Sequence, residues 1–141
     1  MQSSADWGCK MDAIEEQYRR MVFNLIARNQ DDHDKNIAFL LDRSGTWSLA
    51  PAGDVIDAYN PSGTWTSTHQ ISLAGKRDNF TLADVRMVAE TASMKRGRAE
   101  AICRDVTRAV FRWREFAVVA QVLPKHVDMI AGTHRLDPVW T

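Results

Sequence analysis

Apolar residues near the start of the chain recur with the period of one face of an α-helix. Between positions 12 and 28 they fall at i, i+4, i+7, i+8 and i+11, which are Ile14, Tyr18, Met21, Val22 and Leu25. A stripe with this spacing packs on a core while the polar residues between its members face water. The pattern predicts a helix over residues 12–28, and we expect residues 1–11 to form a flexible N-terminal extension.

The next block of sequence, NQDDHDKN at positions 29–36, has no apolar period and predicts a loop. Two short runs rich in aliphatic and aromatic residues follow it, IAFLLD and TWSLAP, separated by an Asp-Arg-Ser-Gly turn. This arrangement is typical of a β-hairpin, which we expect over residues 37–50. Residues 51–80 contain an Asn-Pro-Ser-Gly turn signal and predict a long ordered loop, with one short strand or turn in ISLAGKRD.

Helical periodicity returns after the long loop and continues toward the C-terminal end. Thr81-Leu-Ala-Asp84 resembles a capping box, which marks the start of a helix, and Pro124 suits the first turn of another. The apolar period predicts three helices, over residues 81–92, 98–118 and 124–132. The chain is therefore predicted to be one mainly α domain over residues 12–141, with a small β-hairpin set into it.

Composition restricts the class of protein further. A chain of 141 residues can bury a core without disulfides or metals. The 18 basic and 18 acidic residues leave no net charge, which argues against a whole-surface attraction to nucleic acid or anionic membranes. Cys9 and Cys103 show no metal or redox spacing and are typical of thiols in a reducing compartment. With no membrane-spanning run and no hydrophobic leader, a cytoplasmic protein is expected.

Three polar residues have the types and spacing that phosphoryl transfer requires. Asp31 is followed by Asn36 five residues later, and Asp54 lies beyond the predicted hairpin. Transfer from ATP needs one carboxylate to orient the attacking hydroxyl and accept its proton, and a second carboxylate with a neutral oxygen donor to hold magnesium. The kinase catalytic loop also places its asparagine five residues after its aspartate. The spacing alone fits a solvated, turn-forming loop equally well.

Three longer motifs occur in a fixed order between Tyr18 and Thr81. They are DDHDKN at 31–36, LAPAGD at 49–54 and SLAGK at 72–76. Together with the glycine in the hairpin turn, they resemble the C-terminal domain of the HipA family of serine/threonine protein kinases. That family reads D-x-H-x-K-N, then a hairpin, then L-x-P-x-[YF]-D and S-[IL]-x-G-K. The resemblance implies the C-terminal lobe of a protein-kinase-like fold.

The resemblance also implies a role for each residue of the constellation. Asp31 would be the catalytic base, and Asn36 and Asp54 would be magnesium ligands, so Mg²⁺ and ATP are the expected cofactors. His33 and Lys35 would approach phosphate oxygens or shape the loop, and a purely structural role is equally open.

The neighbours of these residues carry two further expectations. Asp32 and Asp34 are expected to be solvated. The family usually has an aromatic residue where this chain has Gly53. Glycine frees the backbone and removes a side chain that could brace Asp54, so metal binding is expected to be weakened.

An ATP-binding lobe is the part of such a kinase that the sequence does not contain. Kinases hold ATP with a glycine-rich loop and a strand-borne lysine from an N-terminal lobe. The chain has no G-x-G-x-x-G, and no VAIK-like strand precedes the predicted catalytic loop. We therefore expect a fragment, an excised domain or one product of a split gene. It would bind ATP and Mg²⁺ only weakly and be inactive until an N-lobe, in the same or a separate chain, joins it.

The family resemblance implies a type II toxin restrained by a helix-turn-helix antitoxin. The phosphoryl acceptor would be a serine or threonine of a protein such as an aminoacyl-tRNA synthetase. Nucleic acid would be contacted only through the antitoxin, and no membrane contact is expected. Two alternatives stay open: a non-catalytic remnant that binds a partner such as the antitoxin, and a small-molecule phosphotransferase similar to aminoglycoside phosphotransferases. The absence of an H-G-D opening argues against the second.

Other candidate residues have simpler structural explanations. The run 31–34 could be a transition-metal or hydrolytic site, but adjacent residues on an irregular loop rarely converge on one ion. Three histidines are predicted to lie at the surface or the edge of the core: His69, His126 and His134. The basic patches 76–77 and 95–98 predict solvated faces. Three tryptophans are predicted to be packing residues, Trp47, Trp65 and Trp113, and Trp65 could instead line a substrate groove.

Overall fold

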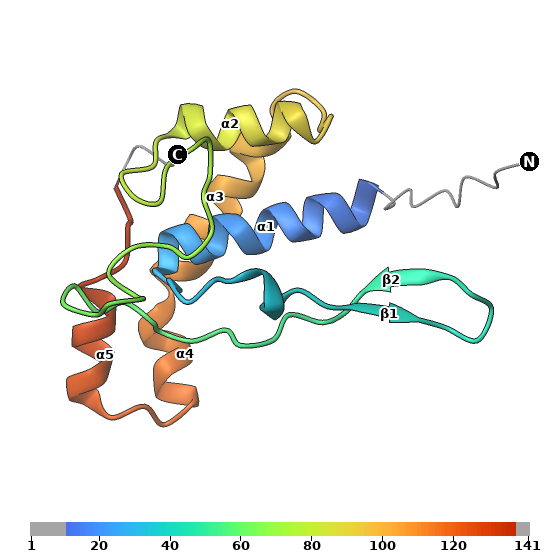
Figure 1. The fold of residues 1–141 in the computed structure, drawn as a ribbon. Helices are drawn as coiled ribbons and strands as arrows, with labels where there is room; N and C mark the ends of the chain where they lie inside the picture. Colours follow the sequence, from blue (N-terminus) through green and yellow to red (C-terminus); the bar gives the residue numbers. More distant parts are fainter. Residues whose placement is uncertain (1–10, 138–141) are drawn as a thin grey trace, which may run out of the picture.

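The computed structural model describes residues 11–137 of the chain. Figure 1 shows a long helix at the centre, shorter helices packed around one side of it, and a hairpin that extends away from the helices. In chain order the elements are α1 (Met11–Ala27), the 3-10 turn η1 (Asp34–Asn36), β1 (Phe39–Leu41), β2 (Trp47–Leu49), α2 (Leu82–Thr91), α3 (Arg98–Phe111), α4 (Trp113–Val119) and α5 (Pro124–Ala131). The prediction of a mainly α fold with a small hairpin is confirmed.

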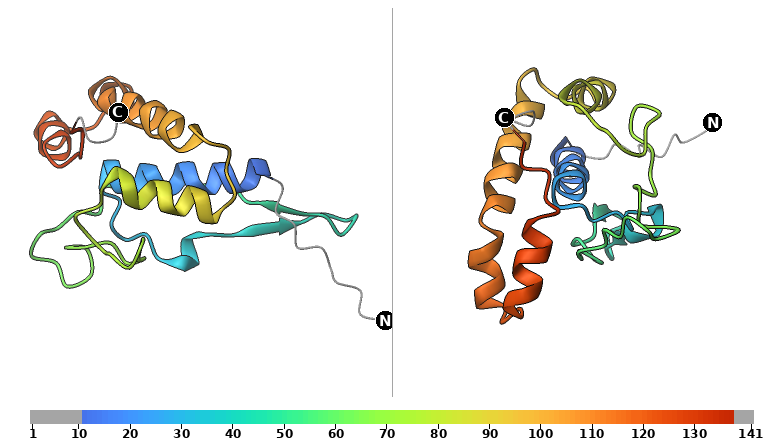
Figure 2. Two further views of the ribbon diagram at one scale, coloured as in Figure 1. Left: turned by 90° about the horizontal axis from the view of Figure 1, so that it is seen from above. Right: turned by 90° about the vertical axis from the view of Figure 1, so that its left-hand side faces the viewer.

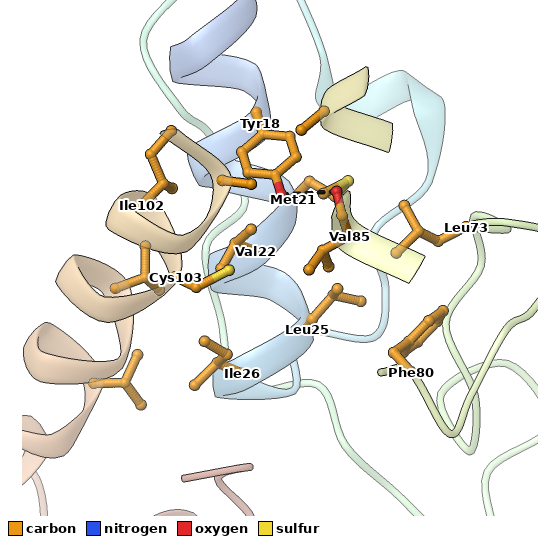
Figure 3. Packing of buried hydrophobic residues seen from close by; sticks show 14 residues of the cluster. Tyr18, Met21, Val22, Leu25, Ile26, Leu73, Phe80, Val85, Ile102 and Cys103 are labelled. Atoms are coloured by element: carbon orange, nitrogen blue, oxygen red, sulfur yellow. Dashed lines mark hydrogen bonds between the residues drawn. The ribbon is translucent and has the colours of Figure 1, made fainter. Parts of the chain in front are cut away.

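Helix α1 forms the centre of the hydrophobic core. Four residues of the predicted stripe are buried, Tyr18, Met21, Val22 and Leu25, and Ile26 joins them, whereas Ile14 is only partly buried. Helices α2 and α3 lie beside α1 (Figure 2) and contribute apolar residues such as Val85, Ile102 and Cys103 (Figure 3). The Tyr18 hydroxyl donates a hydrogen bond to the Val85 carbonyl over 2.9 Å, so the polar end of this buried ring is satisfied.

The long segment between the hairpin and α2 is ordered because it also contributes to this core. Leu73 and Phe80 are buried against the α1 face. Within the segment, Leu73 and Lys76 form an isolated antiparallel bridge, which is the turn expected in this region. The last part of segment 51–80 is therefore held against the core, just before α2 begins.

The predicted hairpin consists of two short antiparallel strands. Phe39 pairs with Leu49, and Leu41 pairs with Trp47. Asp42 closes the turn, because its Oδ1 accepts hydrogen bonds from the backbone N–H groups of residues 44 and 46. Gly45 adopts φ 83°, a left-handed conformation that favours glycine. The turn is therefore determined by residues that lie within it.

Local signals also set the starts of two C-terminal helices. Thr81 caps α2 through a capping box with Asp84, as predicted. Pro124 occupies the first turn of α5. Both helices begin where a side chain or ring satisfies or removes the backbone N–H groups that a helix start leaves free.

The helix predicted over 98–118 is two helices in the structure. The backbone departs from helical geometry at Arg112, with φ −84° and ψ 13°, and α3 ends there. The Trp113 indole N–H donates to the Val127 carbonyl over 3.1 Å, which ties α4 to α5 rather than to α1. The apolar period continues across the break, so periodicity alone could not reveal it.

The ends of helix α1 differ from the predicted ends by one residue each. Helix α1 begins at Met11. It ends at Ala27, because Arg28 adopts φ 55°. The expected flexible extension otherwise lies outside the described residues, as do residues 138–141. Within 11–137 no helix is both long and apolar enough to cross a membrane.

Candidate active site

The loop after α1 is fixed by two buried amide side chains. Asn29 is 3% exposed and its Nδ2 donates to the backbone carbonyl of Asp54 over 3.2 Å. Gln30 is fully buried and its Nε2 donates to the Thr66 carbonyl over 3.0 Å. Both bonds reach segment 51–80, so the loop and the beginning of that segment are held together. No role for Asn29 or Gln30 could be predicted from the sequence, because their partners lie 25 and 36 residues away.

Three side chains converge beside this junction. Asp31, His33 and Asp54 each offer one ligand atom, and these atoms lie within 4.8 Å of one another. Asp31 and His33 are two residues apart and so emerge on the same side of an extended segment. Asp54 reaches the cluster from beyond the hairpin with a left-handed backbone (φ 53°), a conformation that aspartate and asparagine tolerate better than most residues. The predicted base and one predicted metal ligand are therefore neighbours.

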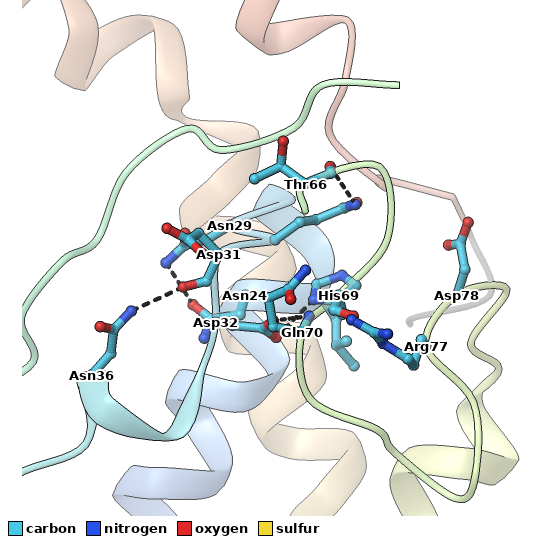
Figure 4. Close-up of polar contacts among 12 residues, drawn as sticks. Asn24, Asn29, Asp31, Asp32, Asn36, Thr66, His69, Gln70, Arg77 and Asp78 are labelled. Atoms are coloured by element: carbon cyan, nitrogen blue, oxygen red, sulfur yellow. Dashed lines mark hydrogen bonds and ion pairs between the residues drawn. The ribbon is translucent and has the colours of Figure 1, made fainter. Parts of the chain in front are cut away.

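Asn36, the other predicted ligand, is attached to the same loop. It closes η1, and its Nδ2 donates to the Asp31 backbone carbonyl over 2.9 Å (Figure 4). The amide nitrogen is used by this bond, which leaves the side-chain oxygen as the donor atom available to a cation. Lys35 is exposed beside it. The five-residue spacing thus has a structural consequence, because Asn36 holds the backbone of Asp31.

A pocket of about 320 Å³ lies between α1 and the residues around Asp54. His33, Asn36 and Asp54 line it, whereas Asp31 and Lys35 do not. Two buried atoms of its lining residues, His33 Nδ1 and Asn29 Oδ1, have no hydrogen-bond partner among the described residues. Buried polar atoms are normally paired, and leaving one unpaired costs about 1–3 kcal/mol. These two atoms are covered by protein, so the polar groups that the pocket can offer to a ligand or cation are the exposed carboxylate of Asp54 and the partly exposed amide of Asn36.

Gly53 directly precedes Asp54, and weakened metal binding at this position stays a prediction. A Cβ atom at this position would meet no atom within 4 Å beyond those of its two chain neighbours. An aromatic side chain here would start in open space, and the backbone of Asp54 is held by Asn29 instead. The bond from Asn29 is therefore one contact that holds the backbone of Asp54 without an aromatic neighbour.

The prediction that Asp32 and His69 are solvated or peripheral is wrong. Asp32 is 4% exposed and His69 is fully buried. His69 Nδ1 lies 2.7 Å from Asp32 Oδ2, and the Gln70 backbone N–H donates to Asp32 Oδ1 over 2.8 Å. Asp34 is exposed as expected. Nothing in the run DDHD distinguishes the buried aspartate from the exposed one, because its donors lie 37 and 38 residues away.

The remaining candidates lie outside the cluster. Lys76 donates to Asp84 over 2.9 Å and Arg77 to the His69 carbonyl over 2.6 Å, so this basic pair is engaged internally rather than only solvated. Trp65 is 70% exposed and is not a packing residue. His134 is partly buried against Trp113, and burial lowers the pKa of its imidazole.

Comparison with known proteins identifies the class of this chain. The HipA-like C-terminal domain family matches residues 2–113, which is most of the sequence. The chain belongs to this family, and the resemblance inferred from the three motifs is confirmed. No curated protein matches the chain. Helices α4 and α5 lie almost entirely beyond the matched residues.

Proposed function

We propose that this chain supplies the catalytic lobe of a HipA-type serine/threonine protein kinase, which transfers the γ-phosphoryl group of ATP to a protein hydroxyl. The observation that carries the proposal is the convergence of Asp31, His33 and Asp54 within 4.8 Å. It occurs beside a pocket lined by Asn36, in a chain of the HipA-like C-terminal domain family. By analogy with its family, the acceptor would be an aminoacyl-tRNA synthetase or a similar protein, and a helix-turn-helix antitoxin would restrain the kinase.

In this proposal Asp31 orients the acceptor hydroxyl and takes its proton. Its side chain is partly exposed, so a hydroxyl can approach it, and the bond from Asn36 to its carbonyl limits its movement. A general base must lie within hydrogen-bond reach of the proton that it accepts, and positioned bases contribute about 10²–10⁴-fold to rate.

The donor set fits a divalent cation. Mg²⁺ prefers oxygen ligands and commonly uses one or two carboxylates together with phosphate oxygens. Asp54 supplies a carboxylate and Asn36 an amide oxygen, and both line the pocket. When bound, Mg²⁺ would neutralise negative charge that develops during transfer. His33 lies within reach of the same position, and exposed Lys35 can extend toward phosphate oxygens.

An N-lobe is the partner that the proposal requires. Apolar side chains of the hairpin are about half exposed: Phe39 at 50%, Leu40 and Leu41 at 54% and Trp47 at 51%. Exposed apolar patches of this kind mark surfaces that bind another protein or domain. The N-lobe would be supplied by a longer polypeptide or by a separate protein. The same surface favours the second candidate function, a non-catalytic module that binds a partner such as the antitoxin.

Asp31→Asn in the kinase assembled with its N-lobe tests the catalytic proposal. The variant should lower the rate of phosphoryl transfer by about 10²–10⁴-fold, because the amide cannot accept the proton. ATP affinity should stay nearly unchanged, since Asp31 does not line the pocket. Asp34→Asn is the matched control, being an exposed aspartate of the same loop. Equal turnover by wild type and Asp31→Asn would remove Asp31 as the base and favour the partner-binding module.

A further inference from the structure

A chain of hydrogen-bonded polar side chains lies directly beneath the loop that carries Asp31. It begins at Asp32, whose side chain is fully buried with that of His69, the two being 2.7 Å apart. His69 Nε2 lies 3.0 Å from Nη1 of Arg135. Arg135 in turn donates from Nη2 to Asp78 over 2.6 Å. Figure 4 shows Asp32 and His69 meeting between the loop after α1 and the long segment that precedes α2.

The donors and acceptors of this chain determine the tautomer of His69. A guanidinium carries five N–H donors and no acceptor, so Arg135 can only donate to Nε2. Nε2 must therefore be the nitrogen with the free lone pair, and Nδ1 must carry the proton. Nδ1–H then donates to the Asp32 carboxylate, which also accepts the Gln70 backbone N–H. Every link in the chain is consistent only with a neutral, Nδ1-protonated imidazole.

The opposite orientations of Asp31 and Asp32 connect this chain to the candidate site. Successive side chains of an extended segment point to opposite sides. Asp31 and His33 share one side and join Asp54, whereas Asp32 between them points into the interior. Two bonds to the Asp32 carboxylate therefore limit rotation of the backbone that carries Asp31.

Arg135 is anchored more strongly than a surface arginine. Its backbone N–H donates to the Ile26 carbonyl and its Nη1 to the Leu25 carbonyl, each over 2.8 Å. These carbonyls belong to the last turn of α1, immediately before the catalytic loop. The side chain is only 11% exposed, and burial lowers the pKa of its guanidinium. Arg135 also lies beyond the residues that match the family, 2–113, so the segment after α5 brings it to the loop.

Stability alone is a weak explanation for such an arrangement. Buried charges lose hydration, and replacing buried ionic groups by apolar residues of similar volume often leaves stability unchanged or improves it. A series of hydrogen-bonded side chains with fixed donors and acceptors instead imposes one geometry on the residues that it joins. Outer hydrogen-bond partners of this kind orient metal-binding side chains, and their loss typically weakens metal affinity or activity about 10–100-fold.

We infer that Asp32, His69 and Arg135 are positioning residues that hold Asp31 and His33 in register with Asp54, with His69 as the Nδ1-protonated link. The inference rests on the proposed function for its catalytic meaning. Its structural content, the tautomer and the coupling of Arg135 to the loop, can be measured in the 141-residue chain without ATP or an N-lobe.

The first test is nitrogen NMR of the wild-type chain with ¹⁵N-labelled histidine. We expect the His69 signals of a neutral ring protonated at Nδ1. A ring protonated at Nε2, or at both nitrogens, at neutral pH would overturn the inference. This measurement needs no variant, so a variant that fails to fold does not affect it.

The second test compares Arg135→Met with Arg86→Met as a matched control. Arg86 also pairs with a carboxylate, that of Glu100, but on the exposed surface. The Arg135 variant should shift the backbone amide signals of residues 31–36 and raise the Kd for Mn²⁺ at least about tenfold, followed by paramagnetic broadening of the loop. The control should leave both unchanged. If Arg135→Met lowered only the melting temperature and left the loop signals as in the control, the inference would be wrong.

These results separate the inference from the proposed function. If wild type failed to broaden with Mn²⁺, the cation role of Asp54 and Asn36 in this chain would fail. The tautomer and the loop amide shifts would still decide whether the buried chain positions Asp31. If Mn²⁺ bound normally but Arg135→Met changed nothing in the loop, only the positioning inference would fall.

Discussion

Asp54→Asn should stabilise the cation-free chain while removing its stabilisation by divalent cations. The carboxylates of Asp31 and Asp54 have oxygens within 4.8 Å of one another. Two unit charges at that separation repel by about 0.9 kcal/mol in water and about 3.5 kcal/mol at an effective dielectric constant of 20. Asp54 is exposed, so the pair lies near the lower value, and added salt lowers it further. Asparagine removes this repulsion and also tolerates the left-handed backbone at position 54.

The cation response provides the second half of the prediction. A cation that binds only the folded chain adds about 1.4 kcal/mol to its unfolding free energy at ten times its Kd. Urea unfolding followed by circular dichroism, with and without Mg²⁺, measures both effects. Wild type should be stabilised by Mg²⁺, whereas Asp54→Asn should be about 1 kcal/mol more stable than wild type without it and insensitive to it.

Asp57→Asn is the appropriate control, because Asp57 is exposed in the same segment but does not belong to the cluster. It should leave the Mg²⁺ response of the chain intact. The reasoning would be refuted if Asp54→Asn destabilised the cation-free chain, or if Mg²⁺ stabilised Asp54→Asn and wild type alike.

Three further predictions test the fold around the site. Val22→Ala should cost about 1.6 kcal/mol of lost burial and about 2–3 kcal/mol with the cavity included, measured by urea unfolding. If the same change at an exposed valine of α4 lowered the unfolding free energy equally, the assignment of Val22 to the core would be wrong. The hydrogen bond from Lys76, with those of the capping box, lowers the pKa of Asp84 below 3.8. The ionised Asp84 carboxylate therefore stabilises the fold above pH 3.8, and this stabilisation is lost as the pH falls through the folded pKa. Thermal melts from pH 7 to 3 should show a smaller fall in melting temperature for Asp84→Asn than for wild type. Equal falls for the two proteins would contradict this prediction. Burial raises the pKa of the Cys103 thiol to about 11, so in Cys9→Ser a thiol reagent should react only after unfolding. Rapid labelling of the folded chain would show that Cys103 is accessible.

The parts of the fold that could be predicted are those with local signals. The apolar period of α1, the glycine in the hairpin turn and the capping box of α2 each act within a few residues, and each prediction is confirmed. The break at Arg112 was missed because the apolar residues keep their period across it. Only the contact from Trp113 to α5 decides that the second half of this region packs elsewhere.

The residues of the candidate site also divide into those that share a local segment and those whose contacts are distant in the sequence. Asp31, His33 and Asn36 share one loop, so their spacing and residue types were visible in the sequence and supported the family assignment. Asp54 was placed with them only through the family resemblance, and the burial of Asp32 and the contact of Arg135 with His69 were not visible. A buried carboxylate is stable only when donors surround it. Here those donors come from residues 69 and 70, and an arginine at position 135 completes the chain. The sequence by itself therefore determined which groups could perform the chemistry, and only the tertiary structure decided which aspartate joins Asp54 and which one is buried against His69.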